Sequence, residues 1–128
     1  MAFRDQLRVL VVDDMSTSRG LITQALESLG IRNIATASDG TSALKTLEAS
    51  PAHLVISDYN MPGMDGLALL EQLRGGARTA GIGFLLITGR AVAAVIDRGR
   101  ALKMNNFIKK PFQPADLKAA IEAIVGRL

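Results

Sequence analysis

The sequence has no cysteine, a single histidine and no long hydrophobic run. Without cysteine the chain can form neither a disulfide framework nor a thiolate metal site, which fits a reducing compartment. No apolar stretch approaches the roughly 20 residues that cross a bilayer. The first residues lack the basic-then-apolar pattern of a signal peptide. We therefore expect a cytoplasmic protein that does not enter the membrane.

The composition is that of an ordinary globular domain. The chain has 128 residues, of which 48% are hydrophobic and 21% charged, and this excludes a disordered chain. The length suits one domain with a real core. The net charge of +3 is mild and does not by itself indicate nucleic acid. Since no repeat or linker interrupts the sequence, we expect a single domain over residues 1–128.

Short apolar runs alternate with segments that carry helical spacing or helix-start and helix-stop residues. The runs that predict strands are 8–12, 33–37, 53–57, 84–88 and 106–110. The segments that predict helices are 16–29, 40–50, 66–73, 91–102 and 114–128. This alternation predicts an α/β fold, in which a parallel five-stranded sheet has helices on both faces. The continuous first run indicates a strand buried on both sides.

Polar side chains stand where four of these strands end. Asp13 and Asp14 follow the first strand, Asp58 follows the third, Thr88 ends the fourth and Lys110 ends the fifth. Right-handed crossovers place the carboxyl ends of parallel strands at one edge of the sheet, where sites form. The sequence therefore predicts three carboxylates, one hydroxyl and one ammonium on a single rim.

Three neighbouring carboxylates repel one another, by roughly 4 kcal/mol for each pair at about 4 Å and an effective dielectric constant near 20. A divalent cation with oxygen ligands, such as Mg²⁺, compensates for this repulsion, and Lys110 offsets another charge. An aspartate can attack phosphorus and form an acyl phosphate. Phosphoryl transfer asks mainly for positioning and charge neutralisation. We interpret Asp58 as the nucleophile, with Lys110 and Thr88 facing the phosphoryl oxygens.

Other catalytic arrangements are poorly supported. His53 stands at the opposite, N-terminal end of its strand, so we interpret it as a surface residue and not as a catalytic base. The sequence has no phosphate-binding loop of the GxxxxGK[ST] or GxGxxG kind. Gly81-Ile82-Gly83 is only a fragment of such a motif and is interpreted as a turn. Nucleotide binding is therefore not expected.

The motifs on this rim match a known family in order and in context. They are Asp13-Asp14, Ile87-Thr88-Gly89, Lys109-Lys110-Pro111-Phe112 and the stretch 57–66, SDYNMPGMDG. With these residues the chain resembles, over essentially its whole length, the receiver domain of two-component response regulators. It is similar in particular to the single-domain chemotaxis regulators of that family. The resemblance implies a three-layer, flavodoxin-like fold with strand order 2-1-3-4-5.

The resemblance also implies roles for the acidic residues. Asp58 would accept a phosphoryl group from a phosphohistidine on a sensor histidine kinase or a phosphotransfer domain. Asp14 and Asp58 would bind Mg²⁺ directly, Asp13 would act through water, and the backbone carbonyl of Asn60 would complete the metal shell. Such a protein is a phosphoaccepting signalling protein and not an enzyme.

A switch mechanism is implied as well. Lys110 would contact the phosphoryl group, and the peptide bond before Pro111 is expected to be cis. Thr88 would move toward the phosphoryl group and Phe107 would turn inward behind it. These movements would remodel the surface formed by the fourth helix, the fifth strand and the last helix, which would bind or release a protein partner. A flagellar motor switch is one candidate partner.

Three residues depart from the pattern of the chemotaxis members. Phe107 replaces the usual tyrosine, Met15 replaces an aromatic residue, and Arg90 stands where the best-known member has an acidic residue. In this family the positions of Asn60 and Arg90 tune dephosphorylation. The lifetime of the phosphorylated state and its phosphatase therefore stay open.

The segment 90–110 is basic and partly apolar. One interpretation is a solvated helix face, and the other is a surface for an acidic partner helix. Its charged residues are Arg90, Arg98, Arg100, Lys103, Lys109 and Lys110 against Asp97 alone. Because the apolar residues at 91–96 occupy more than one helical side, we expect some of Val92, Val95 and Ile96 to be exposed.

Several alternatives remain beside the motor regulator. The receiver could be a phosphate sink or a relay intermediate. A Mg²⁺-dependent phosphohydrolase is less favoured, because it usually needs an acid two residues after the nucleophile and Asn60 cannot supply one. A non-phosphorylated interaction module is disfavoured, since every rim residue is present. With no residues after Leu128, a DNA-binding output would lie on another chain. We expect a monomer.

Overall fold

Five parallel strands form one sheet in the order β2-β1-β3-β4-β5. The structure is a computed structural model, and it describes residues 5–89 and 93–128. The strands are β1 (Arg8–Val12), β2 (Asn33–Ala37), β3 (Leu54–Asp58), β4 (Gly83–Thr88) and β5 (Asn106–Lys109). The helices are α1 (Ser16–Ser28), α2 (Gly40–Ala49), α3 (Gly66–Gly75), α4 (Ala93–Ala101) and α5 (Pro114–Val125). The predicted fold class and strand order are confirmed.

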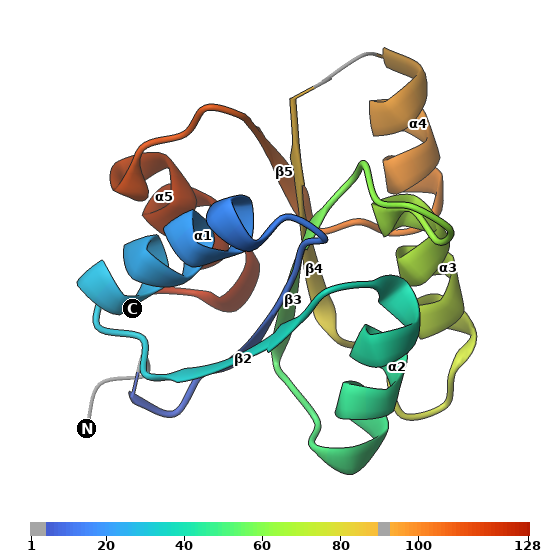
Figure 1. Ribbon diagram of the computed structural model, residues 1–128, viewed down its shortest axis with the longest axis horizontal. Coiled ribbons are helices and arrows are strands. Elements are labelled where there is room, and N and C mark those ends of the chain that lie inside the picture. Colours follow the sequence, from blue (N-terminus) through green and yellow to red (C-terminus); the bar gives the residue numbers. More distant parts are fainter. Residues whose placement is uncertain (1–4, 90–92) are drawn as a thin grey trace.

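The molecule has three layers, with α1 and α5 on one face of the sheet and α2, α3 and α4 on the other (Figure 1). Each face has its own apolar core, because successive side chains of a strand point to opposite sides. In β1, Val9 and Val11 join the core beneath α1 and α5. Leu10 and Val12 join the core beneath α2 and α3. This explains why the first strand is a continuous apolar run.

Two strand ends differ from their predicted bounds in a way that matters for the rim. β3 begins after His53 and includes Asp58, and all five of its residues are buried. Asp58 lies opposite Ile87 of β4 in the register. β5 ends at Lys109, which lies opposite Thr88. Asp58 therefore stands on the last rigid position of a buried strand, while Lys110 stands just beyond the sheet.

The start of β4 corrects one prediction. Residues 81–83 were expected to form a turn. Gly81 does lie in one, but Gly83 is the first residue of β4. Its backbone N–H donates to the His53 carbonyl at 3.0 Å. A Cβ on Gly83 would lie 3.0 Å from Cγ2 of Ile124 on α5. Glycine is thus used here for close packing of helix on strand, and not for a turn.

Some of Val92, Val95 and Ile96 were expected to be exposed, and Ile96 is not one of them. This residue is only 8% exposed. Val95 is half-buried against the core beneath α2 and α3. Arg90 and Val92, which the sequence placed on the same surface, lie outside the described residues.

Helix starts follow ordinary capping chemistry in α2 and α3. Asp39 accepts from the Ser42 N–H at 2.7 Å, and Asp65 accepts from the Ala68 N–H at 2.7 Å. Each carboxylate satisfies a backbone donor that the first helical turn leaves open. Among the helices that the structure describes, none combines the length and hydrophobicity of a membrane span.

Candidate functional site

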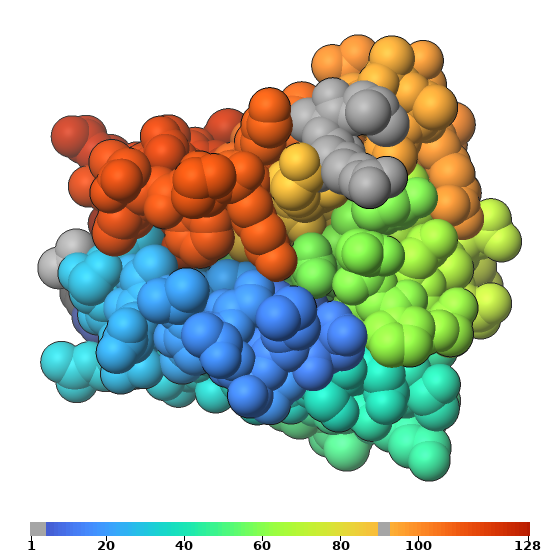
Figure 2. All heavy atoms as spheres, turned by 45° about the horizontal axis from the view of Figure 1, so that its top comes forward, coloured from blue at the N-terminus to red at the C-terminus, as the bar shows by residue number. Residues whose placement is uncertain are grey.

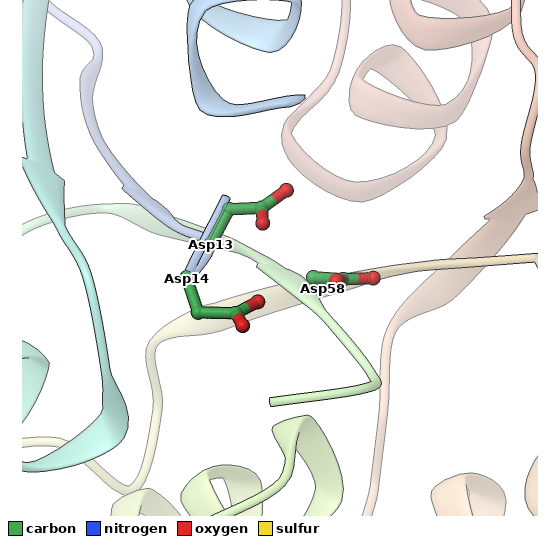
Figure 3. A group of neighbouring side chains, drawn as sticks. All are labelled: Asp13, Asp14 and Asp58. Atoms are coloured by element: carbon green, nitrogen blue, oxygen red, sulfur yellow. The ribbon is translucent and has the colours of Figure 1, made fainter. Parts of the chain in front are cut away.

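Three carboxylates meet at the carboxyl edge of the sheet. Asp13 and Asp14 come from the end of β1, and Asp58 comes from the last position of β3 (Figure 3). Each of the three residues offers a carboxylate oxygen that lies within 4.8 Å of the other two. Asp13 and Asp58 are buried, whereas Asp14 is exposed. The structure thus brings together the three acidic residues that the sequence predicts at the carboxyl edge of the sheet.

Lys110 lies between the two buried carboxylates. Its Nζ is 3.2 Å from Oδ1 of Asp58 and 3.7 Å from Oδ2 of Asp13. The backbone N–H of Lys110 donates to the Thr88 carbonyl at 2.9 Å, which fixes the residue against β4. The Lys110–Pro111 peptide bond is cis, as the resemblance implies. The ammonium therefore supplies one positive charge to a site with three acidic groups.

Asp58 carries an unfavourable charge where it stands. Burial raises the pKa of the Asp58 carboxyl above its usual value. The nearby Lys110 ammonium opposes this rise, and the Asp13 carboxylate adds to it. Because Asp58 is only 6% exposed, water solvates its carboxylate poorly. Further positive charge nearby would stabilise the ionised form.

The carboxylate of Asp13 indicates where a cation would bind. Its Oδ1 accepts from the Met15 N–H at 2.9 Å. Its Oδ2 is buried and has no hydrogen-bond partner among the residues that the structure describes. A buried carboxylate oxygen without a donor is costly, and Lys110 at 3.7 Å is too distant to serve as one. A hard divalent cation, such as Mg²⁺, fits this donor set of carboxylate oxygens.

The loop after Asp58 is held against the sheet. The Tyr59 N–H donates to the Ile87 carbonyl at 3.0 Å, and the Gly66 N–H donates to the Tyr59 carbonyl at 2.8 Å. A Cβ on Gly66 would collide with the carbonyl of Asp58. α3 therefore begins directly against the backbone of Asp58, and only glycine permits that approach. Asn60 lies in this loop and is exposed.

Thr88, Phe107 and His53 are the other residues to which the sequence analysis gave a role or a position. Thr88 is buried, at 2% exposure, at the end of β4. Phe107 on β5 is half-buried and packs against the core beneath α2 and α3. His53 lies before β3, far from the rim along the strand, and its Nδ1 accepts from the Arg8 N–H at 3.0 Å. The expectation that His53 is a surface residue is confirmed, because its side chain is exposed.

Sequence reasoning missed two side chains of α1 that reach the rim. The Lys110 ammonium donates to the Ser18 hydroxyl at 3.0 Å. The Arg19 guanidinium donates to the Asp13 carbonyl at 2.7 Å. The sequence indicated Ser18 only as a member of the predicted helix 16–29. Its place four residues after Asp14, on the first turn of a helix that begins at the rim, is the signal that could have identified it.

The chain belongs to the family of response regulator receiver domains, whose family model matches residues 9–122. Receiver domains are phosphoaccepting signalling proteins, with a histidine kinase as partner. Among the curated relatives, the probable chemotaxis protein CheY of Rhizobium etli is 41% identical over 128 residues, which cover 100% of this chain and 99% of that protein.

Solved structures agree with this family. Chemotaxis protein CheY4 of Vibrio cholerae superposes with a TM-score of 0.86 at 27% identity, covering 92% of this chain and 98% of that one. The receiver domain of a sensor histidine kinase from Pseudomonas aeruginosa gives a TM-score of 0.84 at 23% identity, covering 94% and 98%. That structure has a magnesium ion coordinated in its active-site cleft, and its likeness to this chain shows the fold.

Proposed function

We propose that this protein is a phosphorylation-operated regulator in which Asp58 accepts the phosphoryl group from a histidine kinase or phosphotransfer domain. An Asp58 oxygen attacks phosphorus, the P–N bond to the donor's histidine breaks, and its electron pair returns to the imidazole. The observation that carries this proposal is the position of Asp58 in the charge cluster. It is the buried carboxylate that lies closest to the Lys110 ammonium, at 3.2 Å.

The metal site of this proposal is built from Asp13, Asp14 and Asp58, with the Asn60 backbone carbonyl as a fourth ligand. The unpartnered Oδ2 of Asp13 and the 4.8 Å grouping of the three carboxylates support it. Bound Mg²⁺ would draw charge from the phosphoryl oxygens and lower the repulsion between these anions. Asp13 is held for this task from two sides, by the Met15 N–H and by the Arg19 guanidinium.

The residues around the acceptor have complementary tasks. Lys110 presents its ammonium to one phosphoryl oxygen, and the Thr88 hydroxyl donates to another. Thr88 lies beside Lys109 in the register, and Leu86 of the same strand lies beside Phe107. A shift of Thr88 toward the phosphoryl group would therefore displace the neighbouring residues of β5. Phe107 turns inward as a result and alters the surface of α4, β5 and α5.

Control of chemotaxis is the biological role that the relatives support best, since the relative from Rhizobium etli is named as a probable chemotaxis protein. The partner would then be an acidic helix, such as one from a flagellar motor switch. The exposed Arg100, Lys103 and Lys109 support that charge pattern. Arg98 is also exposed but lies 3.4 Å from Asp65. A phosphate sink or relay intermediate is the alternative role.

Phosphotransfer from labelled kinases tests the proposal. Each histidine kinase of the host is phosphorylated with labelled ATP, purified, and mixed with this protein in Mg²⁺. We expect rapid transfer from at least one kinase to the wild type and none to Asp58→Asn. Asp97→Asn changes an exposed carboxylate of α4 and should accept label like the wild type. Equal transfer to Asp58→Asn would refute the assignment.

A further inference from the structure

We propose that Ser18 is a positioning residue for the phosphorylation of Asp58, acting through Lys110. The inference rests on the proposed function and adds to it a residue from α1. Its basis is the contact in which the Lys110 ammonium donates to the Ser18 hydroxyl at 3.0 Å. This is the shortest of the three polar contacts that the structure gives that ammonium, next to Asp58 at 3.2 Å and Asp13 at 3.7 Å.

The three contacts determine the direction of the Lys110 side chain. An ammonium has three donors on a flexible stem of four carbons, so carboxylates alone hold its position loosely. The side chain of Lys110 is 27% exposed, and it lines a groove between α1 and the segment that begins α5. Ser18 lines the same groove. Without the Ser18 hydroxyl, the ammonium could swing from Asp58 into this groove.

Ser18 is well placed to act as a fixed anchor. It lies on the first turn of α1, and that helix is held on the sheet by its buried residues Ile22, Ala25 and Leu26. The next residue, Arg19, donates to the Asp13 carbonyl at 2.7 Å. The start of α1 therefore holds both the ammonium and the backbone of one carboxylate. In Figure 2 this blue segment lies directly beside the orange segment that follows β5.

A neutral anchor has an advantage over a second carboxylate. When Asp58 forms a bond to phosphorus, it loses its negative charge and so attracts Lys110 less. The Ser18 hydroxyl keeps its hydrogen bond unchanged, and the ammonium remains aimed at the position that the phosphoryl oxygens occupy. Loss of one hydrogen bond to a charged group corresponds to roughly a tenfold change in rate. We expect a loss of that size in the maximal rate, with little change in donor affinity.

The experiment uses phosphoramidate as a small phosphodonor, so that contacts to a kinase play no part. Initial rates are measured in saturating Mg²⁺ over a range of phosphoramidate concentrations. Ser18→Ala should lower the maximal rate about tenfold, and Ser18→Thr, which keeps the hydroxyl, should restore most of it. Ser16→Ala is the matched control, because Ser16 is an exposed serine on the same helical turn.

A double-variant cycle separates positioning from a merely structural effect. In a Lys110→Met background, Ser18→Ala should cause no further loss, because the group that Ser18 positions is gone. NMR of lysine labelled at Cε should show a shifted or broadened Lys110 signal in Ser18→Ala and an unchanged one in Ser16→Ala. Wild-type rates in Ser18→Ala, or an equal loss without Lys110, would overturn the inference. If wild-type Asp58 takes up no phosphoryl group at all, the proposed function itself fails and the inference with it.

Discussion

Removal of the charge of Asp58 should stabilise the protein in the absence of metal. Asp58→Asn keeps the size of the side chain and removes its negative charge. At separations of up to 4.8 Å and an effective dielectric constant of about 20, the two repulsions from Asp13 and Asp14 amount to about 7 kcal/mol. The attraction to Lys110 at 3.2 Å amounts to about 5 kcal/mol on the same basis. The net gain is therefore about 2 kcal/mol, and relief of burial acts in the same direction.

Urea unfolding at pH 7 in the presence of a chelator measures this gain. Burial and Asp13 raise the pKa of Asp58 against the opposing Lys110. The folded state therefore binds its proton more tightly than the unfolded state, and stability falls as the pH rises through that raised pKa. The advantage of Asp58→Asn should accordingly be present at pH 7 and vanish below the ordinary aspartate pKa of 3.8.

Magnesium and a matched variant complete this test. Saturating Mg²⁺ should stabilise the wild type more than Asp58→Asn, because the wild type offers one more carboxylate ligand. Asp97→Asn, at an exposed position on α4, should show neither effect. An Asp58→Asn variant that is less stable than the wild type at pH 7 without metal would refute the electrostatic reasoning.

Three further variants probe local contacts that hold the fold together. Arg74→Met should lower the free energy of unfolding by about 2–4 kcal/mol in thermal melts. The guanidinium donates to four acceptors in residues 80–82 and 103–105. A loss no larger than that of Arg78→Ala, at an exposed position, would contradict this expectation. Gly66→Ala should cost about 1–3 kcal/mol and weaken Mg²⁺ binding by calorimetry, because the new Cβ meets the Asp58 carbonyl. Gly81→Ala, which meets nothing within 4 Å, is its control. Asp65→Ala should lower the melting temperature by the equivalent of about 1 kcal/mol, through loss of the bond to the Ala68 N–H.

The sequence was sufficient to predict which residues stand at the carboxyl ends of the strands. Apolar runs mark the strands locally, and their alternation with helices implies a parallel sheet. The run at 8–12 and the acidic residues after it already implied a buried strand that opens at a functional edge. The rim then followed from Asp58 and Lys110, which stand at the ends of two other strands. The structure adds the distances that join these residues.

Contacts that depend on side-chain direction could not be read in this way. The sequence left open which of Val92, Val95 and Ile96 is exposed, because the apolar residues at 91–96 fit more than one helical side. The structure shows that Ile96 is buried. The hydrogen bond between Ser18 and Lys110 joins residues 92 positions apart. The sequence places Ser18 near the rim, but it does not specify this partner. The role of Gly83 likewise depends on Ile124 of α5, which reaches it from the far end of the chain.

The central claim is that Asp58 takes the phosphoryl group. Intact-protein mass spectrometry after incubation with phosphoramidate and Mg²⁺, followed by reduction of the acyl phosphate with borohydride and peptide mapping, tests it most directly. The account predicts one phosphoryl group for each chain, mapped to Asp58, acid- and base-labile, and absent when a chelator removes the metal. A phosphoryl group on Asp13, Asp14 or any other residue, or one that forms equally without Mg²⁺, would contradict it.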